Sequence, residues 1–171
     1  LAIQKASVRL YDISSETINA IKSLGGVHVD GAVKGFGPLQ CATTDIAKAL
    51  DGADVIMIVA PATAHRAIAR DCAPHLQNGQ TIFLHPGATG GALEFRQVLE
   101  SIGCSASISI AESNSLLYAC RCTEPGRASI FGIKKELKVA SLPSCNTEKV
   151  MQLLSPAFPQ MKPGKNVLET S

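Results

Sequence analysis

The stretch Asp54-Val-Ile-Met-Ile-Val-Ala-Pro61 decides the fold. It is apolar at almost every position, which is typical of a strand covered on both faces, as in parallel sheets. Pro61 ends this strand. Residues 62–76 follow with helical spacing, and Pro74 is expected to break the last turn. A buried strand that leads directly into a helix predicts one unit of a βα alternation.

The same alternation extends to both sides of this stretch. The predicted elements are, in order, a strand over 7–12, a helix over 14–23, a short helix from Asp45 to Leu50, the strand and helix above, a strand over 80–85, a helix over 92–102 and a strand over 105–111. This order implies right-handed crossovers. The sequence therefore predicts an α/β fold with a doubly wound, mostly parallel Rossmann-like sheet.

Other segments depart from this rhythm. Residues 1–6 are expected to be the tail of a helix, and residues 27–39 a hairpin or irregular excursion. Residues 116–139 predict a β-rich C-terminal extension with a turn at Glu124-Pro125-Gly126. A last helix is expected over 145–154. The prolines and glycine within residues 156–171 indicate a linker, so the domain is predicted to span residues 1–155.

Composition limits the partners. Apolar residues make up 46% of the 171 residues and charged residues 18%, which is typical of a folded globular protein. The net charge is only +2, and no basic cluster or Trp is present, so nucleic acid and anionic membrane are excluded as main partners. The apolar runs are far shorter than the roughly 20 residues that span a bilayer. The six cysteines show no zinc-site spacing, so we expect no metal and mostly buried, reduced thiols in a cytoplasmic protein.

Ligands of such sheets bind beyond the carboxyl ends of the strands. The candidate cofactor-binding residues there are Asp12, Val59, Ala60, Pro61, His65, Pro86, Gly87 and Glu112. Asp12 can accept hydrogen bonds from ribose hydroxyls and would then favour NAD over NADP, or it can simply form the turn before the next helix. The phosphate-binding Gly-x-Gly-x-x-Gly is expected about 20 residues before this acid. Only eleven residues precede Asp12, so the first strand and the glycine loop are expected to be missing.

Several of these side chains allow two interpretations. Glu112 can orient a substrate amine or a cofactor ribose, or it can cap the following segment. His65 can face the cofactor or lie exposed on its helix. The glycines of 85–91 allow close approach of a ligand, and the amides of the next helix favour an anion, whereas a tight turn is the alternative. Arg121 is expected to pair with a carboxylate inside the fold. No residue is assigned a catalytic role.

Two longer segments carry a family resemblance. Residues 84–96, Leu-His-Pro-Gly-Ala-Thr-Gly-Gly-Ala-Leu-Glu-Phe-Arg, resemble the Asn-Pro-Gly-Ala-Thr-Gly-Gly-Ala-Leu-Glu-Phe segment of opine dehydrogenases. Residues 112–121 resemble that family's Glu-Thr-x-Ser-x-x-(aromatic)-x-Cys-Arg segment, and residues 54–61 its Asp-Val-Ile-x-Ile-Val-x-Pro strand. His85 departs from the family's Asn.

The resemblance implies an N-terminal domain that binds NAD, with NADP as the alternative. It also implies a catalytic domain beyond the linker and reductive condensation of a 2-oxo acid with an amino acid. In this family a His assisted by an Asp handles the proton, and that His lies just after the matched region, so the isolated chain is expected to be inactive. A ketopantoate reductase or glycerol-3-phosphate dehydrogenase relative, or a non-enzymatic interaction module, are the competing hypotheses. A homodimer stays open.

Overall fold

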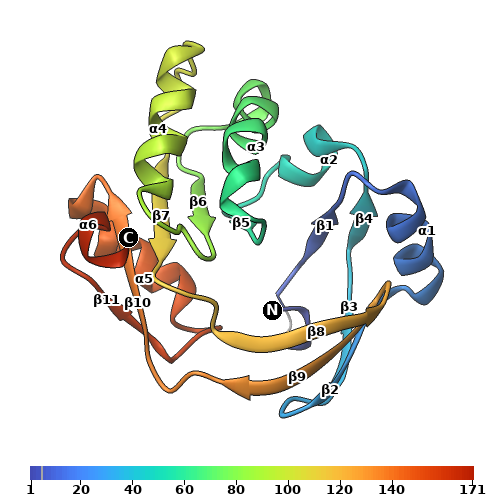
Figure 1. Cartoon of the computed structure of the whole chain (residues 1–171). Helices are drawn as coiled ribbons and strands as arrows, with labels where there is room; N and C mark the ends of the chain where they lie inside the picture. Colours follow the sequence, from blue (N-terminus) through green and yellow to red (C-terminus); the bar gives the residue numbers. More distant parts are fainter. Residues whose placement is uncertain (5) are drawn as a thin grey trace. The chain divides into compact units, whose positions relative to one another are not determined.

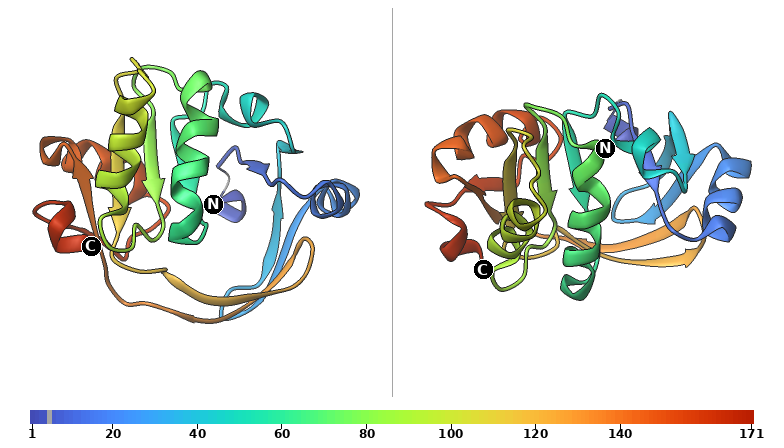
Figure 2. Two further views of the ribbon diagram at one scale, coloured as in Figure 1. Left: turned by 45° about the horizontal axis from the view of Figure 1, so that its top comes forward. Right: turned by 90° about the horizontal axis from the view of Figure 1, so that it is seen from above.

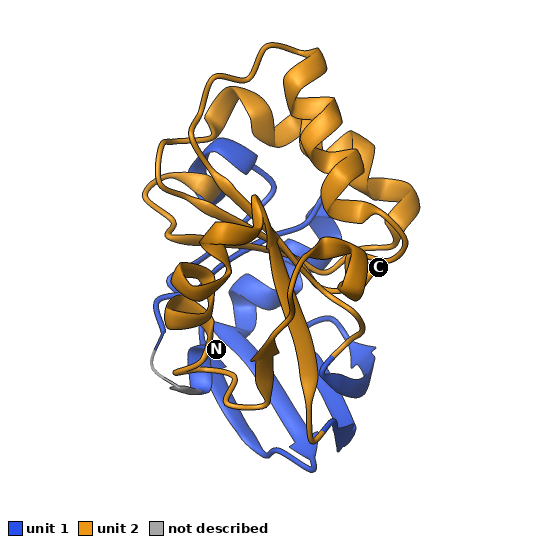
Figure 3. Cartoon of the chain, turned by 90° about the vertical axis from the view of Figure 1, so that its left-hand side faces the viewer, with its two compact units in different colours: residues 1–49, 117–134 blue, residues 50–116, 135–171 orange. Residues whose placement is uncertain are grey.

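The computed structural model describes residues 1–4 and 6–171. The chain forms two compact units, shown in different colours in Figure 3. Unit 1 comprises residues 1–49 and 117–134, and unit 2 comprises residues 50–116 and 135–171. Each unit therefore contains two separate segments of the chain, and each is described by itself.

Unit 1 holds two small sheets and a helix. Its elements are η1 (Ala2–Gln4), β1 (Arg9–Tyr11), α1 (Ser15–Leu24), β2 (Gly26–Gly31), β3 (Gly35–Pro38), β4 (Cys41–Thr43), α2 (Ile46–Leu50, which ends at the unit boundary), β8 (Tyr118–Glu124) and β9 (Arg127–Ile133). Strands β1 and β4 pair in parallel, and the other sheet has the order β3-β2-β9-β8. The expected hairpin over 27–39 is confirmed by the antiparallel pair β2–β3.

Helix α1 begins and ends as its sequence predicts. The Ser14 side chain accepts a hydrogen bond from the Thr17 amide, which satisfies one of the free N–H groups of the first turn. Gly25 ends the helix in the left-handed conformation, with φ 71°. The buried face of α1 presents Ile18 and Ile21 to Ala42 of β4. These residues form the apolar core of unit 1.

Unit 2 is a five-stranded sheet with helices on both faces. Its elements are β5 (Val55–Ile58), η2 (Ala62–Ala64), α3 (His65–Cys72), η3 (Ala73–His75), β6 (Thr81–Leu84), α4 (Gly91–Ser101), β7 (Ser109–Ser113), β10 (Leu137–Leu142), η4 (Ser144–Asn146), α5 (Thr147–Leu154), β11 (Met161–Pro163) and α6 (Val167–Thr170). The strand order is β11-β10-β7-β6-β5 (Figure 1). Helices α3 and α4 pack side by side on one face, and α5 covers the other (Figure 2).

The sheet of unit 2 is mostly parallel, as predicted. β5, β6 and β7 run in parallel, β10 is antiparallel to β7, and β11 is parallel to β10. All four residues of β6 are buried, and β6 is an inner strand of the sheet with β5 on one side and β7 on the other. Residues 54–61, which decided the predicted fold, contain β5. Because β5 is an edge strand of this sheet, Val55 and Met57 stay partly exposed. The coverage on both faces that was expected for residues 54–61 is therefore wrong for β5.

Two segments differ from the expected elements. The strand predicted over 105–111 lies at 109–113, so Glu112 is inside β7 and not beyond it. Residues 156–171, predicted as a linker, contain β11 and α6, which pack within unit 2 because β11 pairs with β10. Of the residues expected as a helix tail, Ala2–Gln4 form a 3₁₀ turn, and Lys5 lies outside the described residues.

The cysteines also differ from expectation. Only Cys72 is buried; Cys41 and Cys104 are half-buried, and Cys120, Cys122 and Cys145 are exposed. Cys120 and Cys122 are exposed because they lie in β8, which is an edge strand of the unit 1 sheet. No helix among the described residues is long and apolar enough to cross a membrane.

Candidate functional site

The carboxyl ends of β5, β6 and β7 lie next to one another in unit 2. The register aligns Ile58 with Leu84 and Leu84 with Glu112, so the three strands end at the same edge. The His85 amide extends this ladder by donating to the Ile58 carbonyl at 2.9 Å. The Gly87 amide donates to the Ser113 carbonyl at 3.1 Å. Seven of the eight candidate residues belong to these strands or to the segments that directly follow them.

The segment after β5 is the open part of this edge. Val59 is 63% exposed, Pro61 is exposed and Ala60 is half-buried. The exposed Val59 side chain at the end of β5 offers a contact surface for an apolar ring of a bound ligand. The segment after β6 is closed by comparison, since Gly87 is buried and Pro86 is half-buried.

His85 is a buried histidine at the end of β6. Its ring stacks on Phe83, with ring centroids 5.3 Å apart, and its Nδ1 atom lies 2.6 Å from Oγ of Ser113. When the Ser113 hydroxyl donates to the Ser115 carbonyl, Nδ1 is the protonated nitrogen and donates to Ser113. Burial lowers the pKa of His85 to about 4, so the ring is neutral at pH 7.

Glu112 is fully buried in β7, and its carboxylate is held by hydrogen bonds from two directions. Oε2 accepts a hydrogen bond from the Ala92 amide at 2.8 Å. Oε1 accepts from the Thr170 hydroxyl at 3.0 Å and from the Ser171 hydroxyl at 3.1 Å. Burial raises the pKa of Glu112, and these hydrogen bonds lower it in part. At the start of α4, where the sequence led us to expect a ligand anion, the Ala92 amide instead donates to the protein's own Glu112 carboxyl group.

Gly87, in the segment 85–91, is required by Glu112. A Cβ atom on residue 87 would overlap the Glu112 side chain, so only glycine fits there. A Cβ atom on residue 91 would lie 3.6 Å from Oε2 of Glu112 and 3.4 Å from Nδ1 of His65. In this loop Ala88 adopts φ 53°, a left-handed conformation that is unfavourable for alanine. The loop is thus shaped by contacts inside the protein as well as by any ligand.

His65 corrects one expectation. The sequence favoured an exposed helical histidine, but His65 is fully buried at the first position of α3. Neither ring nitrogen has a hydrogen-bond partner among the described residues. The reason for its burial is the packing of α3 against α4, which places Gly91 next to the ring. Its contact with the cofactor stays a prediction.

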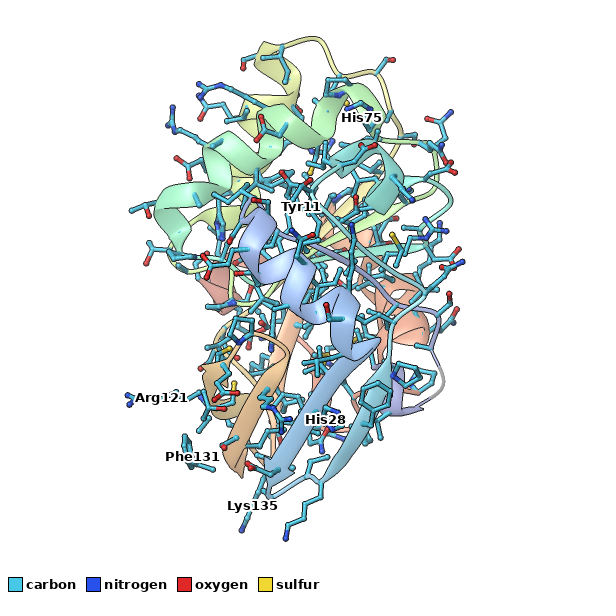
Figure 4. The ribbon with its side chains drawn as sticks, turned by 90° about the vertical axis from the view of Figure 1, so that its right-hand side faces the viewer. Tyr11, His28, His75, Arg121, Phe131 and Lys135 are labelled. Atoms are coloured by element: carbon cyan, nitrogen blue, oxygen red, sulfur yellow. The ribbon has the colours of Figure 1, made fainter. Side chains whose placement is uncertain are left out.

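The eighth candidate, Asp12, lies in unit 1, as does Arg121. Asp12 follows β1, and its Oδ1 accepts a hydrogen bond from the Ser14 amide at 2.7 Å, which is the turn-forming contact. The role of Asp12 toward a ribose stays a prediction. Arg121 was expected to pair inside the fold, but its side chain is exposed and extends away from β8 (Figure 4). None of the described carboxylates forms an ion pair with Arg121, because β8 has no layer covering it.

Two site residues were missed by sequence reasoning: Thr170 and Ser171. A signal for both existed at the start of α6. Asn166 accepts a hydrogen bond from the Leu168 amide, as an N-cap residue does, and Glu169 accepts one from the Lys165 amide just before the helix. Asn166 with an acid three residues later could therefore have predicted the helix that carries them.

Comparison with known proteins gives the following relatives. No family model matches the chain. The chain is 37% identical over 172 aligned residues to an opine dehydrogenase from Arthrobacter sp. (strain 1C), covering 100% of this chain and 48% of that protein. An opine dehydrogenase from Haliotis discus hannai is 32% identical over 84% of this chain. The chain thus spans 48% of the Arthrobacter protein and 36% of the Haliotis protein.

The fold has counterparts among solved structures. An octopine dehydrogenase structure with NADH and pyruvate matches 96% of this chain with a TM-score of 0.79 and 25% identity, and covers 45% of that protein's chain. Ketopantoate reductase from Ralstonia eutropha matches with a TM-score of 0.73 and 18% identity, which shows a shared fold alone.

Proposed function

We propose that this chain, which belongs to the opine dehydrogenase family, supplies the dinucleotide-binding part of an NAD-dependent oxidoreductase. The observation that carries the proposal is the shared edge at the carboxyl ends of β5, β6 and β7. Ligands of doubly wound sheets bind at this edge. The identity to opine dehydrogenases runs over the whole chain, so it includes every strand of that edge.

The open segment after β5 is the part of unit 2 that fits a dinucleotide. Val59, Ala60 and Pro61 would hold the cofactor through apolar contacts and backbone groups. Pro86 and Gly87 would border the same edge, and His65 would lie beneath it. The cofactor, when bound, supplies the hydride.

Asp12 is proposed to select NAD. One carboxylate oxygen forms the turn with Ser14, and the second oxygen would accept from the ribose hydroxyls. A carboxylate at this position would repel the additional phosphate of NADP. Titrating the chain with NADH and NADPH decides this point: we expect tighter NADH binding, and tighter NADPH binding would refute the assignment.

The activity proposed for the whole protein is reductive condensation of a 2-oxo acid with an amino acid. Solved octopine dehydrogenases contain NADH with L-arginine, pyruvate or agmatine, which supports this substrate class. The proton-transfer group is proposed to lie outside the 171 residues, as the family resemblance implies. NADH oxidation by this chain alone with a 2-oxo acid and an amino acid would contradict that placement.

An amide-resolved NMR titration with NADH tests the proposed binding. We expect saturable shift changes for the residues that follow β5 and β6. Val59→Asp should weaken NADH binding for two reasons. The new carboxylate would repel the pyrophosphate, and the apolar contact between Val59 and the cofactor would be lost. The matched control is Ile102→Asp, which changes a 47% exposed apolar residue next to the carboxyl end of α4. Absence of any saturable change in the unmodified chain would contradict the proposal.

A further inference from the structure

Glu112 lies where three parts of unit 2 meet. It belongs to β7, it contacts the first turn of α4 through the Ala92 amide, and it contacts the end of α6 through Thr170 and Ser171. These segments are far apart in the sequence, and no backbone pairing in the sheet joins α4 to α6. A second link connects them directly, since the Gly90 amide donates to the Ser171 hydroxyl at 3.2 Å.

We propose that Glu112 is a positioning residue that fixes the loop of residues 85–91 to helix α6 and does not itself contact the dinucleotide or the substrate. The assignment rests on the proposed function in one respect: it takes the loop of residues 85–91 to border the sheet edge at which the cofactor is proposed to bind. The sequence allowed Glu112 to bind a ligand directly. Its contacts in the structure instead favour a positioning role.

Burial is the first argument for this role. The Glu112 side chain is 0% exposed, and Gly87 and Gly91 pack directly on it. A ligand could reach the carboxyl only by displacing the loop that the same carboxyl holds in place. A group that contacts a ligand at the sheet edge needs open access, as Val59 has and Glu112 lacks.

The hydrogen bonds give the second argument. The Thr170 and Ser171 hydroxyls each lie within hydrogen-bond distance of both Oε1 and the Val167 carbonyl, yet each has one proton to donate. A carboxyl proton on Oε1 would let one of these hydroxyls accept from Glu112 and donate to Val167. Burial raises the pKa of Glu112, which is the direction that favours the protonated form.

This arrangement makes Glu112→Gln a decisive variant. A glutamine amide can accept from the Ala92 amide and donate to the Thr170 and Ser171 hydroxyls, which then donate to Val167. Positioning should therefore survive in the Gln variant. A role that depends on negative charge, such as binding a substrate amine, should not survive.

The test combines hydrogen exchange with NADH titration on the 171-residue chain. In Glu112→Ala we expect amide exchange in α6 to become about tenfold faster or more, since a buried hydrogen-bonded partner is lost. NADH binding should weaken several-fold in the same variant. Glu112→Gln should restore both properties to near those of the unmodified chain. Glu100→Ala, an exposed substitution on α4, is the control and should change neither.

A second variant covers the case in which Glu112→Ala does not fold. Thr170→Val leaves Glu112 in place and removes one hydroxyl, and it should also speed exchange in α6. Two outcomes would overturn the proposal. The first is loss of NADH binding in Glu112→Gln while the amides of α6 stay protected from exchange. The second is unchanged amide exchange in α6 in both Glu112→Ala and Thr170→Val. If the unmodified chain binds no NADH, the proposed function fails, while the exchange data on α6 still decide whether Glu112 positions it.

Discussion

The α-carbon of Gly87 lies against the side chain of Glu112, with no room for a Cβ atom between them. Gly87→Ala should therefore destabilise the protein by about 1–3 kcal/mol, the usual cost of inserting a methyl group into a packed interior. Denaturant unfolding followed by circular dichroism measures this. Gly132→Ala is the matched control, because a Cβ atom there would meet nothing within 4 Å. Equal stability of the two variants would show that the loop moves away from Glu112.

Ala88 should tolerate the opposite change. Its φ of 53° places an alanine in the left-handed region, which costs roughly 1–2 kcal/mol relative to right-handed conformations. Glycine has no such cost but is more flexible when unfolded, so Ala88→Gly should be neutral or stabilising by up to about 1 kcal/mol. The same unfolding assay applies. A clear loss of stability would mean that the Ala88 methyl group has a contact worth more than the backbone strain.

His85 should make stability depend on pH. Its pKa is about 4 in the folded protein, below the ordinary value of 6.5, because burial disfavours the charged ring. The unfolded chain therefore binds a proton that the folded chain does not, and stability falls as pH decreases from 6.5 toward 4. The slope from this single group is at most about 1.4 kcal/mol per pH unit.

His85→Asn isolates this contribution. Asparagine can still donate to Ser113 but cannot titrate, so the difference in unfolding free energy between the two proteins should change over this pH window and stay constant above it. Glu112, whose raised pKa acts in the opposite sense, is present in both proteins and cancels in the comparison. A pH-independent difference would mean that His85 has the same pKa in the folded and the unfolded protein.

The cysteines should react with a thiol reagent at very different rates. Burial, with a smaller contribution from Asp71, raises the pKa of Cys72 to about 12, so its thiolate fraction at pH 8 is negligible. Cys120, Cys122 and Cys145 are exposed and should be alkylated first. Mass spectrometry of peptides after timed alkylation distinguishes them. Labelling of Cys72 as fast as Cys145 in the folded protein would contradict its burial.

The sequence predicted the helices and strands whose local residue pattern agrees with the pairing and packing found in the structure. Helix α1 and strand β6 were recovered because caps and continuous apolar runs act locally. The strand over 105–111 was misplaced because Ser-Ala-Ser-Ile alternates like a strand. In the structure Ser107 instead bonds to the turn before β6: its amide donates to Asn78, and its carbonyl accepts from Gly79.

The candidate site was predicted in its location and not in its contacts. Strand ends can be identified from local signals, which explains why 59–61, 85–87 and Glu112 were found. The partners of Glu112 in α6 are 58 and 59 residues away in the sequence. The burial of His65 likewise depends on how α3 packs against α4. Contacts between distant segments leave no periodic signal that a single sequence can show.

Unit 1 is assembled from two segments that are distant in the chain, and this has a consequence for biosynthesis. Strand β2 pairs in parallel with β9, for example His28 with Arg127. During translation the first 49 residues emerge long before β9 exists, so one edge of β2 waits without its neighbour. Pairings of such long range form slowly, and an unpaired strand edge invites association between nascent chains. The segment 117–134 is therefore the step on which completion of the amino-terminal unit depends.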